Sequence, residues 1–299
     1  RERAMTQTLL RGRTLSFHRW PETADDRDSF TYEEDGAVLI EDGQILASGA
    51  YSQIADKAAA DVLEIDHRPN LILPGFVDCH AHYPQMQVIA SYGAELLDWL
   101  NKYTFPEETK FSNPQHSRRI ARVFLDELIR HGTTSVVAYC SVHKSSAEAF
   151  FSESHSRNML NVAGKVMMDR NAPDYLLDTP KTGYDDSKAL IKKWHGRSRL
   201  MYAITPRFAP TSTREQLEAT GALCTEHPEC YMQTHVSENV NEVAWVKELF
   251  PERSGYLDVY DHYKLCRPRA VFGHGIHLTD DELNCMHRTG SAISHCPTS

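Results

Sequence analysis

Two histidines separated by a single residue are the side chains of this sequence best placed to bind a metal ion. His80 and His82 lie in residues 71–85, LILPGFVDCHAHYPQ, after an apolar run interrupted by Pro74-Gly75. Such a run is typical of a buried strand in a parallel sheet. Because side chains two residues apart in a strand lie on one face, both imidazoles point to the same place. Two converging imidazoles form half of a metal site; the alternative is a pair of surface or core histidines.

Further candidates stand at the C-terminal ends of other predicted strands, at Arg207, His235 and His274. A (β/α)8 barrel builds its active site at that edge, in the loops that follow the strands. A lone histidine there is more often packed than ligating, but four histidines after three strands are difficult to explain by packing. We therefore predict one divalent ion with four ligands, His80, His82, His235 and His274. Imidazole suits Zn²⁺, with nitrogen–metal distances of about 2.0–2.2 Å, but Fe²⁺ and other divalent ions also fit.

A carboxylate with catalytic potential, Glu238, follows His235 by three residues in the sequence HVSE. Three residues after a strand end allow the chain to turn back over the site. A carboxylate beside a metal-activated water can take its proton and return it to a leaving nitrogen. The alternative is a glutamate favoured by the dipole at the N-terminus of a helix predicted over residues 240–250.

The elements that must position these residues alternate between strands and helices from residue 71 onward, as parallel βα units require. After the first strand, six more are predicted, at residues 133–139, 162–168, 200–205, 231–235, 270–274 and 291–295. Helices are predicted at residues 113–131, 144–157, 188–195 and 240–250, and capping-box spacings at Ser212/Glu215 and Thr279/Glu282 open two others. Seven strands are one fewer than a closed (β/α)8 barrel contains.

Residues 1–70 are predicted to be β-rich and separate from the barrel at 71–299. A strand is expected at residues 8–17 and a polar, acidic loop at 21–34. Asp42-Gly43 between the apolar segments 37–40 and 45–47 predicts a β-hairpin. Arg1–Ala4, before Met5, carry no pattern and are left out of the fold prediction.

Composition excludes several classes of protein. The 299 residues are 41% hydrophobic but contain no run of about 18 apolar residues, so a membrane span is not expected. The formal net charge of −9 argues against a nucleic-acid surface. Seven cysteines without a CxxC pair or a signal peptide indicate reduced thiols in the cytoplasm and disfavour a cysteine-ligated zinc.

The segment PGFVDCHAH resembles the first-strand signature of the amidohydrolase superfamily of metal-dependent hydrolases. The resemblance covers nearly the whole chain from about residue 10 and is closest to the guanine-deaminating branch. It is carried by HYPQ and by residues 96–108 (LLDWLNKYTFPEE), 165–179, 202–212, 235–239, 255–263, 274–278 and 295–299 (HCPTS). It implies a (β/α)8 TIM-like barrel beside a small β-sandwich in which N-terminal strands pair with C-terminal ones. It also implies a homodimer.

The resemblance implies a purine pocket lined by Gln85, Arg207 and Phe208, with Trp99 and Leu100 shaping one wall. A glutamine amide both donates and accepts hydrogen bonds, an arginine fork suits a carbonyl oxygen, and a phenyl ring offers a stacking face. His82, His235 and Glu238 are expected to contact the substrate as well, with Glu238 moving the protons. The alternatives are a surface ion pair for Arg207 and core packing for Trp99 and Leu100.

Three polar residues near the site receive lesser roles. His277 and His295 are expected to face solvent or to support the ligands from outside. Asp78, two residues before His80, is expected to orient a ligand imidazole from behind.

The implied reaction is the hydrolytic deamination of guanine to xanthine and ammonia, in purine catabolism or salvage. The alternatives are a related deaminase or chlorohydrolase acting on another aminated heterocycle, or a catalytically dead barrel. The HxE…PCxxC signature of the cysteine-ligated zinc deaminases is absent. In the superfamily an eighth strand supplies an aspartate to the metal, and the sequence stops at Ser299, directly after predicted strand seven. We therefore expect a fragment of a protein of about 400 residues or more.

Overall fold

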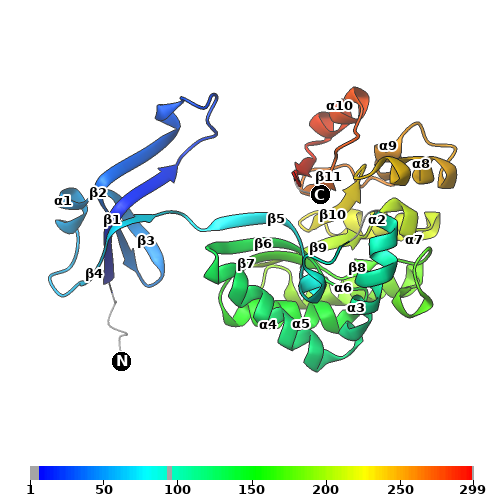
Figure 1. Cartoon of the computed structure of the whole chain (residues 1–299), viewed down its shortest axis with the longest axis horizontal. Coiled ribbons are helices and arrows are strands. Elements are labelled where there is room, and N and C mark those ends of the chain that lie inside the picture. The colour runs from blue at the N-terminus through cyan, green and yellow to red at the C-terminus, as the bar shows by residue number, and fades with distance from the viewer. Residues whose placement is uncertain (1–6, 93–95, 298–299) are drawn as a thin grey trace. The chain divides into compact units, whose positions relative to one another are not determined.

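A computed structural model of the chain describes residues 7–92 and 96–297 (Figure 1). The chain divides into two compact units, one ending at Gly75 and the other beginning at Phe76. Each unit has its own hydrophobic core.

The first unit is a four-stranded sheet in the order β3-β2-β1-β4. Its elements are β1 (Gln7–Phe17), a 3-10 turn (Arg27–Ser29), β2 (Phe30–Glu41), β3 (Gln44–Ala50), α1 (Tyr51–Ala55) and β4 (Leu63–Ile72). The predicted hairpin is confirmed, because β2 and β3 pair antiparallel across Asp42 and Gly43. Both turn residues have positive φ, 48° and 79°, as the two-residue hairpin turn requires. Leu9, Leu39 and Ile54 pack in the core of this unit.

Two expectations for this unit are wrong. The polar loop predicted at residues 21–34 ends earlier, since β2 begins at Phe30. The strand β4 was not predicted at all, although it pairs in parallel with β1 from Thr8↔Leu63 onward. Nine of the ten residues of β4 are exposed. Apolar and polar residues alternate only over residues 63–66 (LEID), before the polar and proline-containing segment HRPN interrupts the pattern.

In the described residues of the second unit, an eight-stranded sheet forms a nearly closed barrel; seven parallel strands follow the order β12-β11-β10-β9-β7-β6-β5, and the short β8 pairs with β9 beside them. The strands are β5 (Phe76–His82), β6 (Thr133–Tyr139), β7 (Leu160–Gly164), β9 (Leu200–Pro206), β10 (Tyr231–Val236), β11 (Ala270–His274) and β12 (Ala292–Ser294). All seven predicted barrel strands are therefore present. The strand predicted at 162–168 is divided, because Val166–Met167 forms a separate piece, β8, that also pairs with β9.

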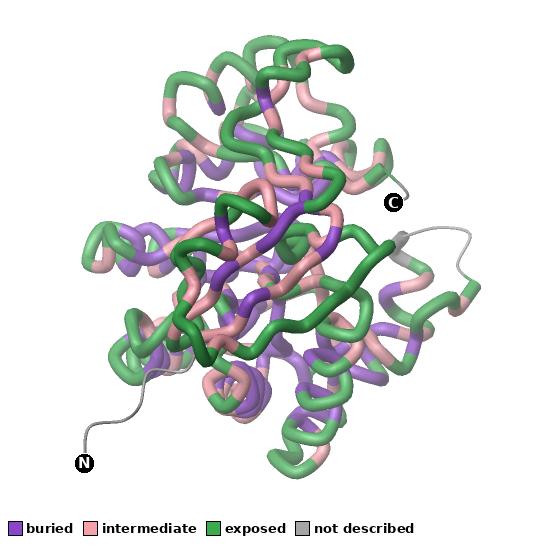
Figure 2. The backbone as a smooth tube through the Cα atoms, turned by 90° about the vertical axis from the view of Figure 1, so that its left-hand side faces the viewer, coloured by how far each residue is buried: buried purple, intermediate pink, exposed green. Residues whose placement is uncertain are grey.

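Helices connect the barrel strands. They are α2 (Leu96–Trp99), a π-helical turn (Leu100–Thr104), α3 (Phe105–Glu108), α4 (Pro114–Arg130), α5 (Lys144–Ser156), α6 (Pro180–Trp194), α7 (Arg214–Glu226), α8 (Val240–Leu249), α9 (Tyr256–His262) and α10 (Asp280–Thr289). Short 3-10 turns lie at Tyr83–Val88, Thr109–Ser112, Asp174–Leu176 and Ala209–Thr211. The longer helices carry both buried and exposed positions (Figure 2). No helix in the described part of the chain is both long and apolar enough to cross a membrane.

The helix starts follow ordinary capping chemistry. Asn113 caps α4 by accepting hydrogen bonds from the N–H groups of Gln115 and His116, as a short polar side chain does at an N-cap. The capping box predicted at Thr279 and Glu282 is confirmed. The other predicted box is wrong.

At that second helix start, Thr213 caps α7 and accepts from the N–H of Gln216. Ser212, the predicted cap, instead donates a side-chain hydrogen bond to Gln216 Oε1 (2.9 Å). The helix therefore begins one residue later than predicted.

The first barrel strand also differs from its prediction. We expected β5 to be buried, but Phe76 and Val77 are 57% and 62% exposed. The strand lies at the end of the sheet order, where it pairs only with β6 among the described strands. The two histidines near the end of this strand, His80 and His82, are nevertheless partly buried.

Candidate metal centre and adjoining pocket

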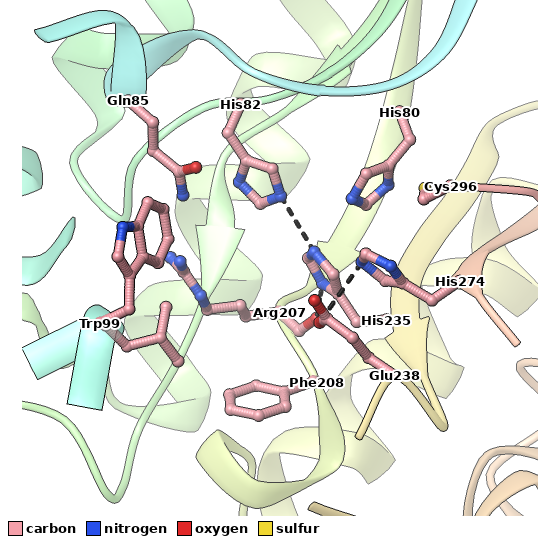
Figure 3. A pocket seen from close by; sticks show the side chains of 11 residues that line it. His80, His82, Gln85, Trp99, Arg207, Phe208, His235, Glu238, His274 and Cys296 are labelled. Carbon is pink, nitrogen blue, oxygen red and sulfur yellow. Dashed lines mark hydrogen bonds and ion pairs between the residues drawn. The ribbon is translucent and has the colours of Figure 1, made fainter. Parts of the chain in front are cut away.

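The predicted site residues meet in one cavity of about 310 Å³. Figure 3 shows imidazoles and Glu238 on one side and Gln85, Trp99 and Arg207 on the other. The lining residues are His80, His82, Gln85, Trp99, Leu100, Arg207, Phe208, His235, Glu238, His274 and Cys296. Cys296 is the one lining residue that was not predicted, and no pattern in the sequence distinguishes it from the other cysteines.

The four imidazoles form a tight cluster supplied by three strands. The ring of His80 lies 5.2, 4.7 and 4.9 Å from those of His82, His235 and His274, between centroids. The His235 ring is 4.9 Å from His82 and 5.5 Å from His274. One ligand atom each from His80, His235 and His274 lie within 4.8 Å of one another. The four predicted ligand rings thus lie together, but His82 is not part of the group whose ligand atoms all meet within this distance.

The hydrogen bonds of His235 fix which of its nitrogens is free. Its Nδ1 lies 2.7 Å from the main-chain carbonyl oxygen of Arg207, so Nδ1 carries the proton and donates it. Its Nε2 is then unprotonated and faces Nε2 of His82 at 2.9 Å (Figure 3). A backbone carbonyl that orients an imidazole in this way is the usual support of a histidine metal ligand.

Two further nitrogens leave their hydrogen-bonding capacity unused. Nδ1 of His82 and Nδ1 of His274 are buried without a hydrogen-bond partner among the described residues. Nε2 of His82 and Nε2 of His274 are the atoms that contact His235 and Glu238, so the indication of a bound cation comes from these converging nitrogens and not from the unpaired Nδ1 atoms. The donor set, four imidazoles, is one that Zn²⁺ and other divalent transition metals accept.

Burial keeps the cluster neutral. Burial, helped by the neighbouring His274 and Arg207, lowers the pKa of His80 to about 3. Burial alone lowers the pKa of His274 to about 4. Burial and the adjacent imidazoles hold the pKa values of His82 and His235 well below the ordinary value. Neutral imidazoles keep the lone pairs that a metal ion needs.

The backbone around the cluster is shaped for close approach. A Cβ atom at Gly273 would lie 2.6 Å from Cε1 of His80, so only glycine lets that ring lie against β11. His274 and Ser237 adopt positive φ angles of 73° and 50°, which cost free energy in residues that have a side chain.

Asp78 acts on the backbone and not on an imidazole. Its Oδ1 accepts a hydrogen bond from the main-chain N–H of His80 (3.0 Å). The expected support of a ligand ring by Asp78 is therefore wrong. His277 and His295 are exposed, in agreement with their expected lesser roles.

Glu238 points into the cavity (Figure 3). Its Oε2 lies 3.3 Å from Nε2 of His274. The N-terminus of α8 is capped by Asn239 and Glu242, which form a capping box. Since Asn239 and Glu242 already cap the N-terminus of α8, the position of Glu238 does not need to be explained by the helix dipole.

Arg207 is buried in an ion pair that the sequence did not reveal. Its Nη1 lies 2.8 and 3.0 Å from the two carboxylate oxygens of Glu108, and both side chains are almost inaccessible. Gln85 Nε2 lies 3.4 Å from Glu108 Oε1. The alternative of a surface ion pair for Arg207 is therefore wrong, and Glu108 is a functional candidate that we did not predict. Glu108 ends the motif LLDWLNKYTFPEE (residues 96–108), which carries part of the family resemblance, but nothing in that motif indicated a partner for its carboxylate.

The wall residues serve the cavity and a small core at once. Leu100 and Phe208 belong to a buried cluster against which Trp99 packs. The Phe208 ring lies 6.5 Å from the His235 ring, nearly perpendicular to it. The two alternatives for Trp99 and Leu100, pocket wall and core packing, both hold.

Residues 71–299 match the model of the amidohydrolase family. The chain belongs to the amidohydrolase family. Within that family it is similar to guanine deaminases. It is 46% identical over 266 residues to the guanine deaminase of Escherichia coli (strain K12), a match that covers 89% of this chain and 61% of the relative.

Solved structures agree with this placement. The structure of E. coli guanine deaminase superposes with a TM-score of 0.94 at 42% identity, covering 97% of this chain and 68% of that one. Guanine deaminase from C. acetobutylicum, solved with guanine bound in its active site, gives a TM-score of 0.86 at 33% identity, covering 98% and 68%. The chain thus spans about six tenths to two thirds of the length of these relatives.

Proposed function

We propose that this chain carries the metal centre and base pocket of a guanine deaminase, which hydrolyses guanine to xanthine and ammonia. The observation that carries the proposal is one cavity that joins four neutral imidazoles and a carboxylate to Gln85 and Arg207. The first group suits hydrolysis and the second suits recognition of a nucleobase. The similarity to guanine deaminases supports the same substrate.

The metal ligands that we propose are His80, His82, His235 and His274, and the ion we propose is zinc, with iron as the alternative. Such an ion lowers the pKa of water and so supplies the nucleophile at neutral pH. The chain's own part is to hold the four imidazoles neutral and converging, through burial and the Arg207 carbonyl. Glycine at 273 gives the His80 ring its space.

Glu238 is proposed as the proton carrier. The overall reaction adds the oxygen of water to C2 of guanine and breaks the bond from C2 to the exocyclic nitrogen. The two protons of that water must move to a ring nitrogen and to the leaving ammonia. A carboxylate within reach of both groups can take and return these protons, and Glu238 lies in the cavity beside His274.

The base is proposed to lie between Phe208 and the polar pair of Gln85 and Arg207. Arg207 donates toward the carbonyl oxygen of guanine, and Gln85 reads the ring N–H beside it. Phe208 gives an apolar face for the ring. Trp99 and Leu100 close the wall.

An absorbance assay of guanine conversion to xanthine, with ammonia measured in parallel, tests this function. The metal-loaded protein should convert guanine. Removal of the metal by a chelator should abolish this activity, and return of the metal should restore it. Adenine and an aminated triazine serve as control substrates. Turnover of the triazine without turnover of guanine would support a deaminase or chlorohydrolase of another heterocycle, and turnover of none would support the dead barrel.

We also propose a homodimer that works in the cytoplasm in purine breakdown or salvage. These proposals rest on the similarity to guanine deaminases. Light scattering of the purified protein gives its mass in solution, and a monomer at all concentrations would overturn the first of them.

A further inference from the structure

Glu108 is a fully buried carboxylate that contacts both polar residues of the proposed base pocket. It ends α3, in a segment anchored by Phe105 and Phe111, which are buried as well. The guanidinium carbon of Arg207 lies 5.5 Å from the centre of the Phe105 ring. Glu108 is therefore held on a packed element, and it does not line the cavity itself.

The carboxylate determines how the two neighbours are oriented. A carboxylate only accepts hydrogen bonds, so Gln85 must turn Nε2 toward it, as observed at 3.4 Å. The carbonyl oxygen of Gln85 then remains for the cavity. Arg207 uses Nη1 for both contacts with Glu108, which leaves its other N–H groups. An arginine offers five donors in a fixed fork.

We propose that Glu108 is a positioning residue that sets the polarity of the base-reading edge. Resting on the proposed function, this inference adds how the pocket selects among purines. The edge offers an acceptor from Gln85 next to donors from Arg207. A purine with a ring N–H beside a carbonyl, as in guanine and hypoxanthine, matches that order. Adenine, which has an unprotonated ring nitrogen beside an amino group, presents the reverse order.

Glu108→Gln tests the polarity directly. Arg207 would require the new amide to turn its oxygen toward the guanidinium, and the new Nε2 would then donate to Gln85. Gln85 must then turn its own carbonyl oxygen toward residue 108 to accept this hydrogen bond, which leaves its Nε2 facing the cavity. The acceptor of the reading edge would thereby become a donor.

The measurement is the dissociation constant of hypoxanthine and of adenine, by calorimetry on the metal-loaded full chain. Neither has an amino group at C2, so binding is separated from deamination. The unaltered protein should prefer hypoxanthine. E108Q should weaken hypoxanthine binding by about tenfold or more, because the buried ring N–H loses its acceptor, and adenine binding much less. The matched control is Glu107→Gln, since Glu107 is also buried but pairs with Lys110 outside the cavity.

A double variant, Gln85→Glu with Glu108→Gln, distinguishes positioning from simple structural support. It keeps one carboxylate, one amide and the arginine, so the net charge of the three is unchanged. Gln at 108 would accept from Arg207 and donate to Glu at 85, which can present only an acceptor to the cavity. The preference for hypoxanthine should therefore return.

Two results would overturn the inference while leaving the proposed function intact. One is an E108Q protein that keeps the selectivity of the unaltered protein. The other is a double variant that folds, as shown by circular dichroism, but does not select hypoxanthine. If E108Q itself does not fold, the double variant alone decides whether the inference holds. An unaltered protein that binds no purine would overturn the proposed function and, with it, the inference.

Discussion

Replacing Glu238 by glutamine removes the one carboxylate among the residues that line the described cavity. The substitution preserves size and polarity, and the side chain is 16% exposed, so the fold should tolerate it. The carboxylate lies 3.3 Å from His274, whose pKa of about 4 keeps that imidazole neutral. Because a neutral imidazole forms no full ion pair with the carboxylate, this contact should contribute no more than about 1 kcal/mol to stability.

The expected effect on turnover is larger than the contribution of that contact to stability. Removing a general acid–base costs roughly 10²-fold or more, which is about 2.7 kcal/mol of barrier or more at 1.36 kcal/mol per tenfold. Guanine binding and metal content should stay near those of the unaltered protein. The assay is guanine turnover, with the metal measured by elemental analysis.

Glu242→Gln is the comparison variant, because Glu242 caps α8 from outside the cavity. It should lower the thermal midpoint and leave the chemical step in place. The expected result for E242Q is lower stability with near-normal turnover. If E238Q gave the same result, the assignment of proton transfer to Glu238 would be refuted.

Other substitutions give separate tests. Arg207→Met should weaken guanine binding by about 1–3 kcal/mol and adenine binding far less, and the unpaired Glu108 should lower the free energy of unfolding by about 3–5 kcal/mol; equal effects on both bases would contradict the role of Arg207. Gly273→Ala should reduce metal content, since the new Cβ would lie 2.6 Å from the His80 ring; full metal occupancy would show that the ring can move aside. Thr279→Ala should cost about 1 kcal/mol of stability by removing the cap of α10, seen by denaturant unfolding, with unchanged metal content.

The metal cluster could be predicted because strand ends are visible in the sequence. His80, His82 and His274 follow apolar runs, His235 ends the predicted strand YMQTH, and parallel strands of a barrel direct such residues to one edge. Their convergence needed no knowledge of distances. The seven barrel strands were predicted for the same reason, that buried strands are continuous in hydrophobicity.

The elements that were missed depend on contacts between distant residues. Glu108 acquires its meaning from Arg207, which lies 99 residues later in the chain. The strand β4 pairs with β1, and its alternation of apolar and polar residues is confined to residues 63–66. The burial of β5 was misjudged because an apolar composition does not reveal whether a strand lies inside or at the end of a sheet.

Arg207 contacts the two halves of the site with different parts of itself. Its side chain reaches Glu108 on the side of the proposed base pocket, while its main-chain carbonyl accepts from Nδ1 of His235 in the histidine cluster. Every amino acid supplies a carbonyl, so a substitution at position 207 changes the pocket without removing the acceptor that orients the ligand. If Arg207 and its partner Glu108 change together, the proposed base pocket can therefore diverge in evolution while the support of His235 is kept.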